Sequence, residues 1–475
     1  MTTSSSTTKL ISGGTIVSAT GADPADVLID GDTIVAVLSP GSSLAVAAAQ
    51  SAEIIDATGK YVIPGGVDVH THMELPTSGT TSSDTFTTGT IAAAWGGTTT
   101  IVDFPTQTFG RNVRECLDEW HAKAEGNCAI DYGFHMILGD VNADSLAAMD
   151  GLVDEGITSF KLFMAYPGVL LSDDRQILQV MQQCAENGSM VMMHAENGIA
   201  IDLLAEQAAA RGETAPVNHG LVRRHELESE ATHRAIKLAK VGAAPLYIVH
   251  LSASGALEEV ARARGEGANV FAETCPQYLY LSLEEHLGAP GFEGAKYVCS
   301  TPLRSAHEHH HADLWKGLRA NDLSVVSTDH CPFCFKDQKE LGADDFRAIP
   351  NGIGGVEHRM DLIYQGVLAG EITLPRWVEL CSTTPARMFG MYPQKGTIQP
   401  GADADIVLYD PKARWTISAG NHHMNMDYSA YEGFEVQGKV DTVISRGRVI
   451  VADEEFLGAA GDGKYIKRGL SQYLV

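Results

Sequence analysis

Eight short apolar runs, separated by segments of helical character, constrain the fold of this chain more than any other feature. The first is VIPGGVDVHTH (residues 62–72) and the last is LSVVSTDHCP (residues 323–332). Segments such as RNVRECLDEWHAKAEG (residues 111–126) and DDRQILQVMQQCAENG (residues 173–188) stand between them. The runs are apolar throughout, as strands buried on both faces of a parallel sheet are. Strand and helix alternating in this way predict an α/β fold with a (β/α)8 barrel of the TIM type.

The two ends of the chain resemble each other more than either resembles the middle. Both consist of short β-branched runs separated by Gly, Asp and Pro, which are typical of strands and turns. We therefore expect a small β-sandwich domain built from both termini. The predicted boundaries are residues 1–63 and 393–450 for the sandwich, 64–392 for the barrel, and 451–475 for a C-terminal arm that could contact another subunit.

Side chains able to bind a metal ion lie at the ends of five of the eight runs. They are His70 and His72 in the first run, Lys161 in the fourth, His194 in the fifth, His250 in the sixth, and Asp329 with His330 in the eighth. The C-terminal ends of barrel strands meet at one mouth, and residues i and i+2 of a strand share a face. Each residue alone has an ordinary structural explanation, but the set predicts a metal site. His330 could either support that site or be purely structural.

Lys161 is the unusual member of this set, because SFKLFM (residues 159–164) places its ammonium in an apolar strand. Burial lowers the pKa of a lysine and favours the neutral amine. A neutral amine can add to carbon dioxide, which forms a carbamate and releases one proton. The carbamate is an anionic oxygen ligand that can bridge two metal ions. Four neutral histidines and one aspartate supply only one negative charge against the positive charge of two metal ions. The carbamate would supply a second negative charge.

Composition excludes several other classes of protein. The formal net charge is -26, spread along the chain, which argues against a nucleic-acid partner. No apolar stretch approaches the length of a membrane span, and the N-terminal residues do not resemble a signal peptide. Eight scattered cysteines suit a reducing compartment, so we expect a cytoplasmic protein with no membrane partner. Cys331 and Cys334 form a CxxC without a second pair and are interpreted as ordinary loop cysteines.

Further histidines are interpreted as structural. His307, His309, His310 and His311 lie in SAHEHHHADLW at the start of an expected helix, away from the strand ends, where a solvated helix start is the simpler explanation. His135 lies within the third apolar run, where we expect a core residue.

Six stretches, PGGVDVHTH, GGTTTIVDF, FKLFMAYPG, MMHAENG, YIVHLS and STDHCPF, together resemble the cyclic amidohydrolases, specifically dihydropyrimidinases and D-hydantoinases. The resemblance extends over most of the chain and implies the same barrel with a terminal β-sandwich. It also implies that His70, His72 and Asp329 hold one divalent metal ion and that His194 and His250 hold a second. Carboxylated Lys161 (N6-carboxylysine) would bridge the two. Zinc is the family's usual metal, although the ligand types also suit manganese. The family is commonly homotetrameric.

The resemblance implies hydrolysis of the cyclic amide bond of 5,6-dihydropyrimidines (dihydrouracil and dihydrothymine, in pyrimidine catabolism), of 5-substituted hydantoins, or of both. The products would be N-carbamoyl amino acids. A metal-bridging hydroxide would attack the ring carbonyl, Asp329 would carry the proton to the leaving nitrogen, and Tyr166 would stabilise the oxyanion. Ser300 and Asn351 would bind the ring with Tyr166, largely through backbone groups. The chain reads CSTPLR where the family pattern is CSPPLR, so Thr301 departs from that pattern beside Ser300.

Other functions remain open from the sequence. An allantoinase would use the same chemistry, whereas a dihydroorotase would call for a carboxylate-binding arginine that HTHMELPTSG does not supply. A non-catalytic scaffold homologue would have lost metal ligands, and here every ligand position is filled. Between dihydropyrimidines and hydantoins the sequence decides little. Met73, Leu75 and Phe86 are predicted to line a pocket for a hydrophobic ring substituent.

Overall fold

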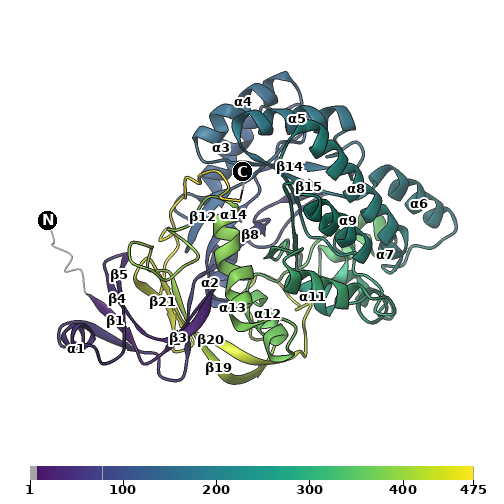
Figure 1. Ribbon diagram of the computed structural model, residues 1–475. Coiled ribbons are helices and arrows are strands. Elements are labelled where there is room, and N and C mark those ends of the chain that lie inside the picture. Colours follow the sequence, from purple (N-terminus) through teal and green to yellow (C-terminus); the bar gives the residue numbers. More distant parts are fainter. Residues whose placement is uncertain (1–7, 78, 474–475) are drawn as a thin grey trace.

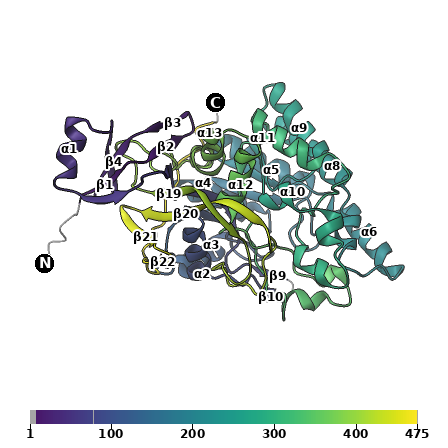
Figure 2. The ribbon, with the colours of Figure 1, turned by 90° about the horizontal axis from the view of Figure 1, so that it is seen from below.

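The computed structural model describes residues 8–77 and 79–473 of the chain. Figure 1 shows two parts, a barrel surrounded by helices and a group of β-sheets at its lower left. The sheets combine purple N-terminal and yellow C-terminal strands, and Figure 2 shows the same grouping from below. Both parts therefore follow the expected organisation, an α/β barrel with a smaller β domain built from the two ends of the chain.

Eight parallel strands form the barrel within the described residues. They are β8 (Gly66–Thr71), β11 (Thr98–Asp103), β12 (Asp131–Phe134) continued by β13 (Met136–Ile137), β14 (Ser159–Phe163), β15 (Met190–His194), β16 (Leu246–Ile248), β17 (Val270–Thr274) and β18 (Val325–Val326). The barrel closes where the chain after β18 returns to β8. There the His72 N–H donates to His330 O at 2.8 Å, and the His330 N–H donates to His70 O at 3.3 Å.

The barrel strands are buried on both faces, which explains their continuous apolar sequence. Val69, Phe104, Met192, Tyr247 and other apolar residues fill the interior. The outer faces pack against helices, of which the larger ones are α2 (Phe86–Trp95), α3 (Val113–Ala124), α4 (Ala143–Asp154), α5 (Asp174–Asn187), α8 (His225–Gly242), α9 (Ser254–Gly265), α11 (His310–Ala320) and α12 (Arg359–Leu368). Shorter ones are α7 (Asn218–Val222), α10 (Pro276–Tyr280), α13 (Leu374–Val378) and α14 (Thr384–Met388), while α6 (Gly198–Ala210) projects from the body (Figure 1).

Helix α5 shows how local sequence determines an element. Asp173 caps its first turn by accepting from the Gln176 N–H at 2.8 Å, and the Gln176 side chain accepts from the Asp173 N–H at 3.0 Å. Ile177, Val180, Met181 and Cys184 are buried at helical spacing. Gly188, with φ of 75°, ends the helix in the left-handed region that glycine tolerates.

Within residues 8–77 and 79–473, the β domain contains two sheets. One has the order β5–β4–β1–β6, formed by β1 (Lys9–Ser12), β4 (Asp26–Asp30), β5 (Thr33–Leu38) and β6 (Glu53–Asp56). The other has the order β22–β21–β20–β19–β7–β2–β3, formed by β2 (Thr15–Ser18), β3 (Gly21–Pro24), β7 (Tyr61–Pro64), β19 (Ile406–Thr416), β20 (Glu435–Ser445), β21 (Arg448–Ala452) and β22 (Glu455–Phe456). The helix α1 (Ser43–Ala49) joins β5 to β6. Because β22 lies beyond residue 450, this sheet continues into the segment expected to be an arm.

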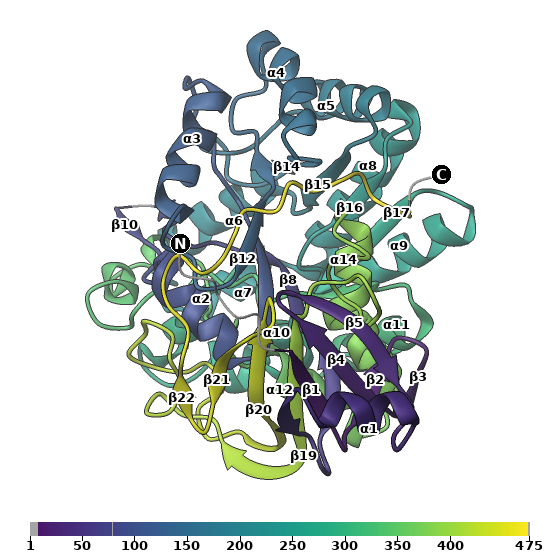
Figure 3. The same ribbon diagram turned by 90° about the vertical axis from the view of Figure 1, so that its left-hand side faces the viewer.

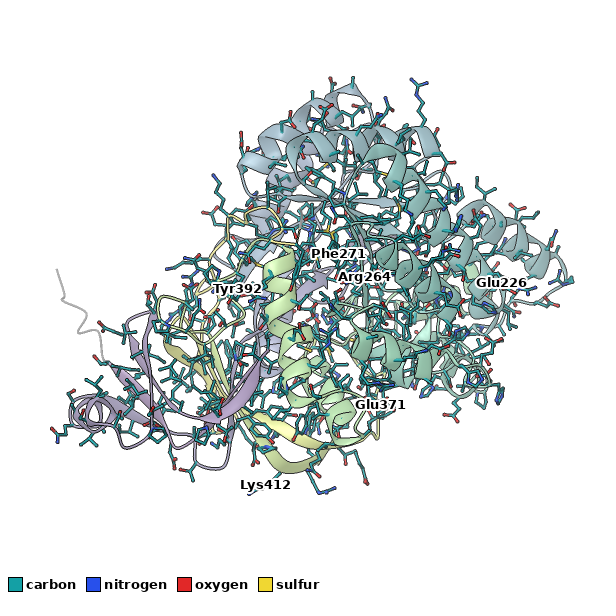
Figure 4. The ribbon with its side chains drawn as sticks, in the orientation of Figure 1. Glu226, Arg264, Phe271, Glu371, Tyr392 and Lys412 are labelled. Atoms are coloured by element: carbon teal, nitrogen blue, oxygen red, sulfur yellow. The ribbon has the colours of Figure 1, made fainter. Side chains whose placement is uncertain are left out.

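The rest of that C-terminal segment packs on its own barrel. The Ile466 N–H donates to Tyr132 O at 2.7 Å, and the buried Arg468 donates to the Ser159 hydroxyl at 3.0 Å. Figure 3 shows this yellow segment crossing the face of the barrel that is turned to the viewer. Near its end the Tyr473 ring approaches Phe271, which stands beside Arg264 in Figure 4. The arm therefore covers the N-terminal ends of the barrel strands in its own chain, and a contact with another subunit remains a proposal.

A buried network of ion pairs joins the two parts. The Lys395 Nζ atom lies 2.5 Å from Asp131 Oδ2 of β12 and 2.6 Å from Asp405 Oδ2, just before β19. It also lies 2.9 Å from Asp403 Oδ2. Arg446 of the β domain reaches Asp131 Oδ2 at 2.7 Å. The β domain is thus fixed to the barrel by charge as well as by apolar packing.

Among the described residues, the helices are all too short or too polar to cross a membrane.

Candidate active site

The side chains predicted to bind metal converge at the C-terminal ends of the barrel strands. The Asp329 Oδ1 atom lies 3.1 Å from His70 Nε2 and 3.2 Å from His72 Nε2. One ligand atom from each of these three residues lies within 4.8 Å of the other two. His70 and His72 therefore face the same space, as their spacing on one strand predicts.

Lys161 of β14 lies in the middle of this group. Its Nζ atom donates to His70 Nε2 at 2.9 Å and lies 4.4 Å from the centre of the Phe104 ring. Burial lowers the pKa of Lys161 to about 8, although Asp329 and Glu273 act to raise it. The amine is therefore much closer to its neutral, nucleophilic form than an exposed lysine is.

His194 and His250 form the other side of the group. Their ring centres are 4.6 Å apart, and the His250 ring is 5.5 Å from that of His70. The His194 Nε2 atom donates to Glu196 Oε2 at 2.8 Å, which leaves Nδ1 as the nitrogen that could bind a metal. The structure thus brings all six predicted ligands together.

Three residues of the site have left-handed backbone conformations. The φ angles are 41° at His250, 51° at Asp329 and 61° at Tyr166. Residues with side chains rarely adopt such angles, and when they do the surrounding structure must compensate for the strain. Strain at three residues that face one space is typical of a functional site.

The charge of the site favours metal ligation. Burial, followed by repulsion from Lys161, lowers the pKa of His70 far below its usual range; burial and His194 do the same for His250. Burial alone would raise the pKa of Asp329, but His70 and His72 outweigh it and hold that pKa at about 2. His70 and His250 are therefore neutral and the Asp329 carboxylate is ionised at neutral pH, which are the forms that bind divalent cations.

Unpartnered polar atoms test whether a metal would fit. His72 Nδ1 and His250 Nδ1 are buried and have no hydrogen-bond partner within the described part of the chain. Buried polar atoms are costly unless something satisfies them. Imidazole nitrogens and a carboxylate, gathered around an amine with a lowered pKa, are the donor set of a metal site with nitrogen and oxygen ligands. The residues present fit such a group.

Glu273 of β17 was not among the predicted site residues. It accepts a very short hydrogen bond from His70 Nδ1, a bond from the Tyr247 hydroxyl at 2.9 Å, and one from the His250 N–H at 3.1 Å. Burial raises the pKa of Glu273 to about 7. Its carboxylate fixes the His70 ring so that Nε2 faces the site. The signal was available, because VFAET places an acidic residue at the end of an apolar strand.

Tyr166, Ser300 and Asn351 lie together beside the metal-binding group. The Tyr166 ring centre is 5.5 Å from that of His194. Burial raises the pKa of Tyr166, and this outweighs the lowering by the Arg223 guanidinium and the smaller lowering by the neighbouring Ser300 and Asn351. The phenol therefore stays protonated at neutral pH and is available as a hydrogen-bond donor.

Thr301, the departure from the family pattern, supports this region. Its hydroxyl donates to His250 O at 3.1 Å and to Ser252 Oγ at 2.8 Å, and its carbonyl accepts from the Tyr278 hydroxyl at 2.8 Å. Thr301 thus ties the segment that carries Ser300 to the backbone of the predicted ligand His250.

Both ring nitrogens of His330 are used away from the metal-binding group. Its Nε2 donates to Asp84 Oδ2 at 2.9 Å, and its Nδ1 accepts from the Gly355 N–H at 3.1 Å. This favours the structural interpretation of His330. His135 is buried and bonded to Val69 O at 3.0 Å, as expected of a core residue.

One member of the histidine-rich segment joins a small cluster. Ligand atoms of His225, Glu308 and His310 lie within 4.8 Å of one another. However, His310 Nδ1 accepts from the Ser254 N–H at 3.0 Å, so Nε2 carries the proton that it donates to Glu308 at 2.6 Å. That tautomer has no nitrogen free for a metal ion, and the cluster is a hydrogen-bonded helix start.

The prediction that Met73, Leu75 and Phe86 line a pocket for a ring substituent is wrong for two of the three residues. Met73 and Phe86 are completely buried in the core between barrel and helices, because Met73 packs on Gly89 and Phe86 on Phe134. Leu75 remains partly exposed.

All eight cysteines are free, with Cys331 buried and Cys334 partly exposed.

Comparison with known proteins is consistent with this geometry. The Amidohydrolase family matches residues 61–450. The D-hydantoinase of Streptomyces coelicolor is 62% identical over 98% of this chain and 99% of its own. A D-hydantoinase of Ralstonia pickettii is 48% identical over 97% of this chain and 98% of its own. The crystal structure of dihydropyrimidinase from Brevibacillus agri superposes with a TM-score of 0.94 at 47% identity, covering 98% of this chain and 99% of that one.

Proposed function

The chain belongs to the amidohydrolase family and is a hydrolase of cyclic amides related to hydantoinases and dihydropyrimidinases, and on that premise we propose that it opens 5-substituted hydantoins and 5,6-dihydropyrimidines with the help of two divalent metal ions. The observation that carries the proposal is the convergence of His70, His72, Lys161, His194, His250 and Asp329 beside Tyr166. The products are N-carbamoyl amino acids.

His70, His72 and Asp329 would hold one metal ion, and His194 and His250 the other. When bound, such ions lower the pKa of water and polarise a carbonyl group. The nitrogen and oxygen donors suit zinc. Glu273 and Glu196 hold the rings of His70 and His194, which leaves His70 Nε2 and His194 Nδ1 as the nitrogens that would bind the ions.

Lys161, once carboxylated, would supply an anionic oxygen ligand to the metal ions in this proposal. Its neutral amine attacks carbon dioxide, the new N–C bond forms, and one proton leaves to give the carbamate. Support comes from the position of Nζ, which lies between imidazoles and two aromatic rings and faces His70 Nε2 at 2.9 Å. A carbamate there would replace a buried positive charge with a negative charge among neutral imidazoles.

Asp329 and Tyr166 carry out the proton and charge transfers. Water adds to the ring carbonyl carbon, and the Asp329 carboxylate takes its proton. The Tyr166 hydroxyl donates to the oxyanion that develops on the carbonyl oxygen. Asp329 then gives the proton to the ring nitrogen as the C–N bond breaks. Ser300 and Asn351 hold the ring in place, and no covalent intermediate with the enzyme is needed.

Among possible substrates, we propose 5-substituted hydantoins of D configuration as the preferred class. The support is similarity, since the relative at 62% identity is named a D-hydantoinase. Dihydrouracil and dihydrothymine offer the same imide edge and the same scissile amide, so the site should also accept them. Leu75, partly exposed after the first strand, could contact the ring substituent.

The remaining assignments follow from the family and are proposals. We propose a cytoplasmic homotetramer, with residues 8–63 and 393–456 as the β-sandwich, 64–392 as the barrel and 457–473 as an arm, because β21 and β22 extend the sandwich beyond the predicted boundary at residue 450. An allantoinase remains the alternative if neither substrate class is opened. A scaffold function is disfavoured because every predicted ligand is present and faces one space.

One assay tests the proposal. Zinc-loaded protein is given D-5-phenylhydantoin, L-5-phenylhydantoin and dihydrouracil separately, and ring opening is followed by the loss of ultraviolet absorbance. We expect turnover that chelator abolishes, with the D-hydantoin fastest. A preference for dihydrouracil would make the protein a dihydropyrimidinase, and turnover of none of the three by metal-loaded protein would contradict the proposal.

A further inference from the structure

Lys339 is a fully buried lysine outside the metal-binding group. It begins the short 3₁₀ helix η3 (Lys339–Gly342) and has no measurable solvent exposure. Its partners are three backbone carbonyls: Val298 O at 2.9 Å, Pro350 O at 2.7 Å and Gly352 O at 2.8 Å. Among residues 8–77 and 79–473 no carboxylate forms an ion pair with it. A buried ammonium without a counter-charge is costly, so its retention calls for an explanation.

The three carbonyls belong to the two segments that carry the substrate-binding residues. Val298 is two residues before Ser300, and Pro350 and Gly352 stand on either side of Asn351. An ammonium has three N–H donors, and here each has one acceptor. The two segments are also joined directly, because the Gly352 N–H donates to Val298 O at 3.0 Å.

We propose that Lys339 is a positioning residue that fixes the backbone segments of Ser300 and Asn351 relative to each other, so that together they bind the imide edge of the substrate. This inference rests on the proposed function, because it takes Ser300 and Asn351 as substrate-binding residues. The Lys339 ammonium donates to backbone carbonyls and to none of the metal-binding side chains.

The effect on Asn351 is electronic as well as geometric. Pro350 O belongs to the same peptide group as the Asn351 N–H. When a cation donates to the carbonyl of a peptide group, it polarises that group and strengthens the N–H as a donor. The ammonium thus orients Asn351 and improves its backbone donor for a ring carbonyl.

The surroundings of Lys339 keep this arrangement rigid. The Phe333 ring lies 5.6 Å from Nζ, and the Lys339 N–H donates to Cys334 O at 3.0 Å. Gly342 is packed so tightly on Ile349 that any side chain at residue 342 would collide with it. On the other segment, His219 Nε2 donates to Cys299 O at 2.8 Å. Both segments are therefore also held by contacts that do not involve the lysine side chain, and the Lys339 ammonium joins the two.

The test compares Lys339→Met and Lys339→Gln with the wild type. Methionine keeps the length of the side chain and removes all donors, whereas glutamine retains an amide that can donate to two carbonyls. We expect KM for a hydantoin to rise at least about tenfold in Lys339→Met and less in Lys339→Gln, with kcat within about threefold and metal content unchanged. The matched control is Lys336→Met, an exposed lysine three residues away, which should leave KM unaltered.

The outcomes separate this inference from the proposed function. If the wild type opens hydantoins and both variants fold with wild-type KM, the positioning role is wrong and the proposed function stands. A fall in kcat with loss of metal would also overturn it, because Lys339 would then act on the metal-binding group. If neither variant folds, the lysine is only structural. If the wild type opens no cyclic amide, the proposed function fails and the inference fails with it.

Discussion

Lys161 is the residue whose chemistry most distinguishes this site from a barrel with ordinary polar strand ends. Its Nζ faces His70 Nε2 in a fully buried position, and burial brings its pKa to about 8. The substitution Lys161→Ala should lower kcat/KM at least about 10³-fold and reduce bound metal below two ions per subunit. A short carboxylic acid, such as propionate, should restore part of both, because its carboxylate can occupy the space that the carbamate leaves.

The control for this experiment is Lys412→Ala, an exposed lysine at the lower edge of the β domain in Figure 4. It should retain wild-type metal content and activity. A fully metallated and active Lys161→Ala protein would refute the bridging role.

Glu273 supports a ligand that the sequence did identify. In Glu273→Gln, the neutral amide would orient His70 but no longer raise its basicity, so metal affinity should fall by about 10- to 100-fold. Titration of metal-free protein with zinc measures this. Tyr247→Phe is the matched control, since it removes only one hydrogen bond from the Glu273 carboxylate and should cost less than tenfold. Equal effects of the two substitutions would show that the charge on Glu273 does not matter.

Tyr166 should act on the transition state and not on the metal. The substitution Tyr166→Phe removes the hydroxyl near Ser300 and Asn351 and should lower kcat by about 10²- to 10³-fold with metal content unchanged. Steady-state kinetics measures kcat, and metal analysis of the same preparation measures the metal content. A kcat within about threefold of the wild type would exclude Tyr166 as the oxyanion donor.

At the scale of elements, helix α12 carries Asp361, a buried acidic residue whose ionisation lowers the free energy of unfolding. Asp361 is buried with Oδ1 unpartnered among the described residues, and burial raises its pKa to about 7. In the unfolded chain it ionises near 3.8. Between these values the unfolded state binds fewer protons than the folded state, so the free energy of unfolding falls as pH rises through this window.

Asp361→Asn should therefore be more stable than the wild type at pH 8, by about 2–4 kcal/mol, and equal to it near pH 4. Urea denaturation at both pH values measures the difference. The exposed Asp344→Asn is the control and should follow the wild type at each pH. A constant difference between Asp361→Asn and the wild type across pH would contradict the assigned pKa.

Local sequence predicted the elements well and the supporting contacts poorly. The apolar runs identified the barrel strands, and the polar residues at their ends identified the predicted ligands, because both signals lie within a few residues of one another. Glu273 was overlooked because its role depends on His70, about 200 residues earlier in the chain. Met73 and Phe86 were misplaced because sequence does not show which side of a turn, or of the first turn of a helix, packs inward.

At the scale of the whole molecule, the ion network around Lys395 joins barrel and β domain. Replacing Lys395 with Met would leave Asp131, Asp403 and Asp405 with too little positive charge, since only Arg446 remains. Breaking a buried network in this way costs about 3–5 kcal/mol. Urea denaturation should show that loss, or a separate early transition of the β domain.

Arg448→Met is the matched control, because the Arg448–Asp462 pair at 2.7 Å is much more exposed. It should cost no more than about 1 kcal/mol. If the two substitutions destabilised the protein equally, the network would not hold the domains together. Neither this network nor the course of the C-terminal segment could be predicted from sequence, since both depend on contacts between residues hundreds of positions apart.

The central claim is that two metal ions at the strand ends open a cyclic amide. Metal-free protein is titrated with zinc in the presence of bicarbonate while ring opening of D-5-phenylhydantoin is followed. We predict no turnover without metal and activity that rises until about two zinc ions are bound per subunit. Full activity without metal, or no activity when both sites are filled, would contradict the claim.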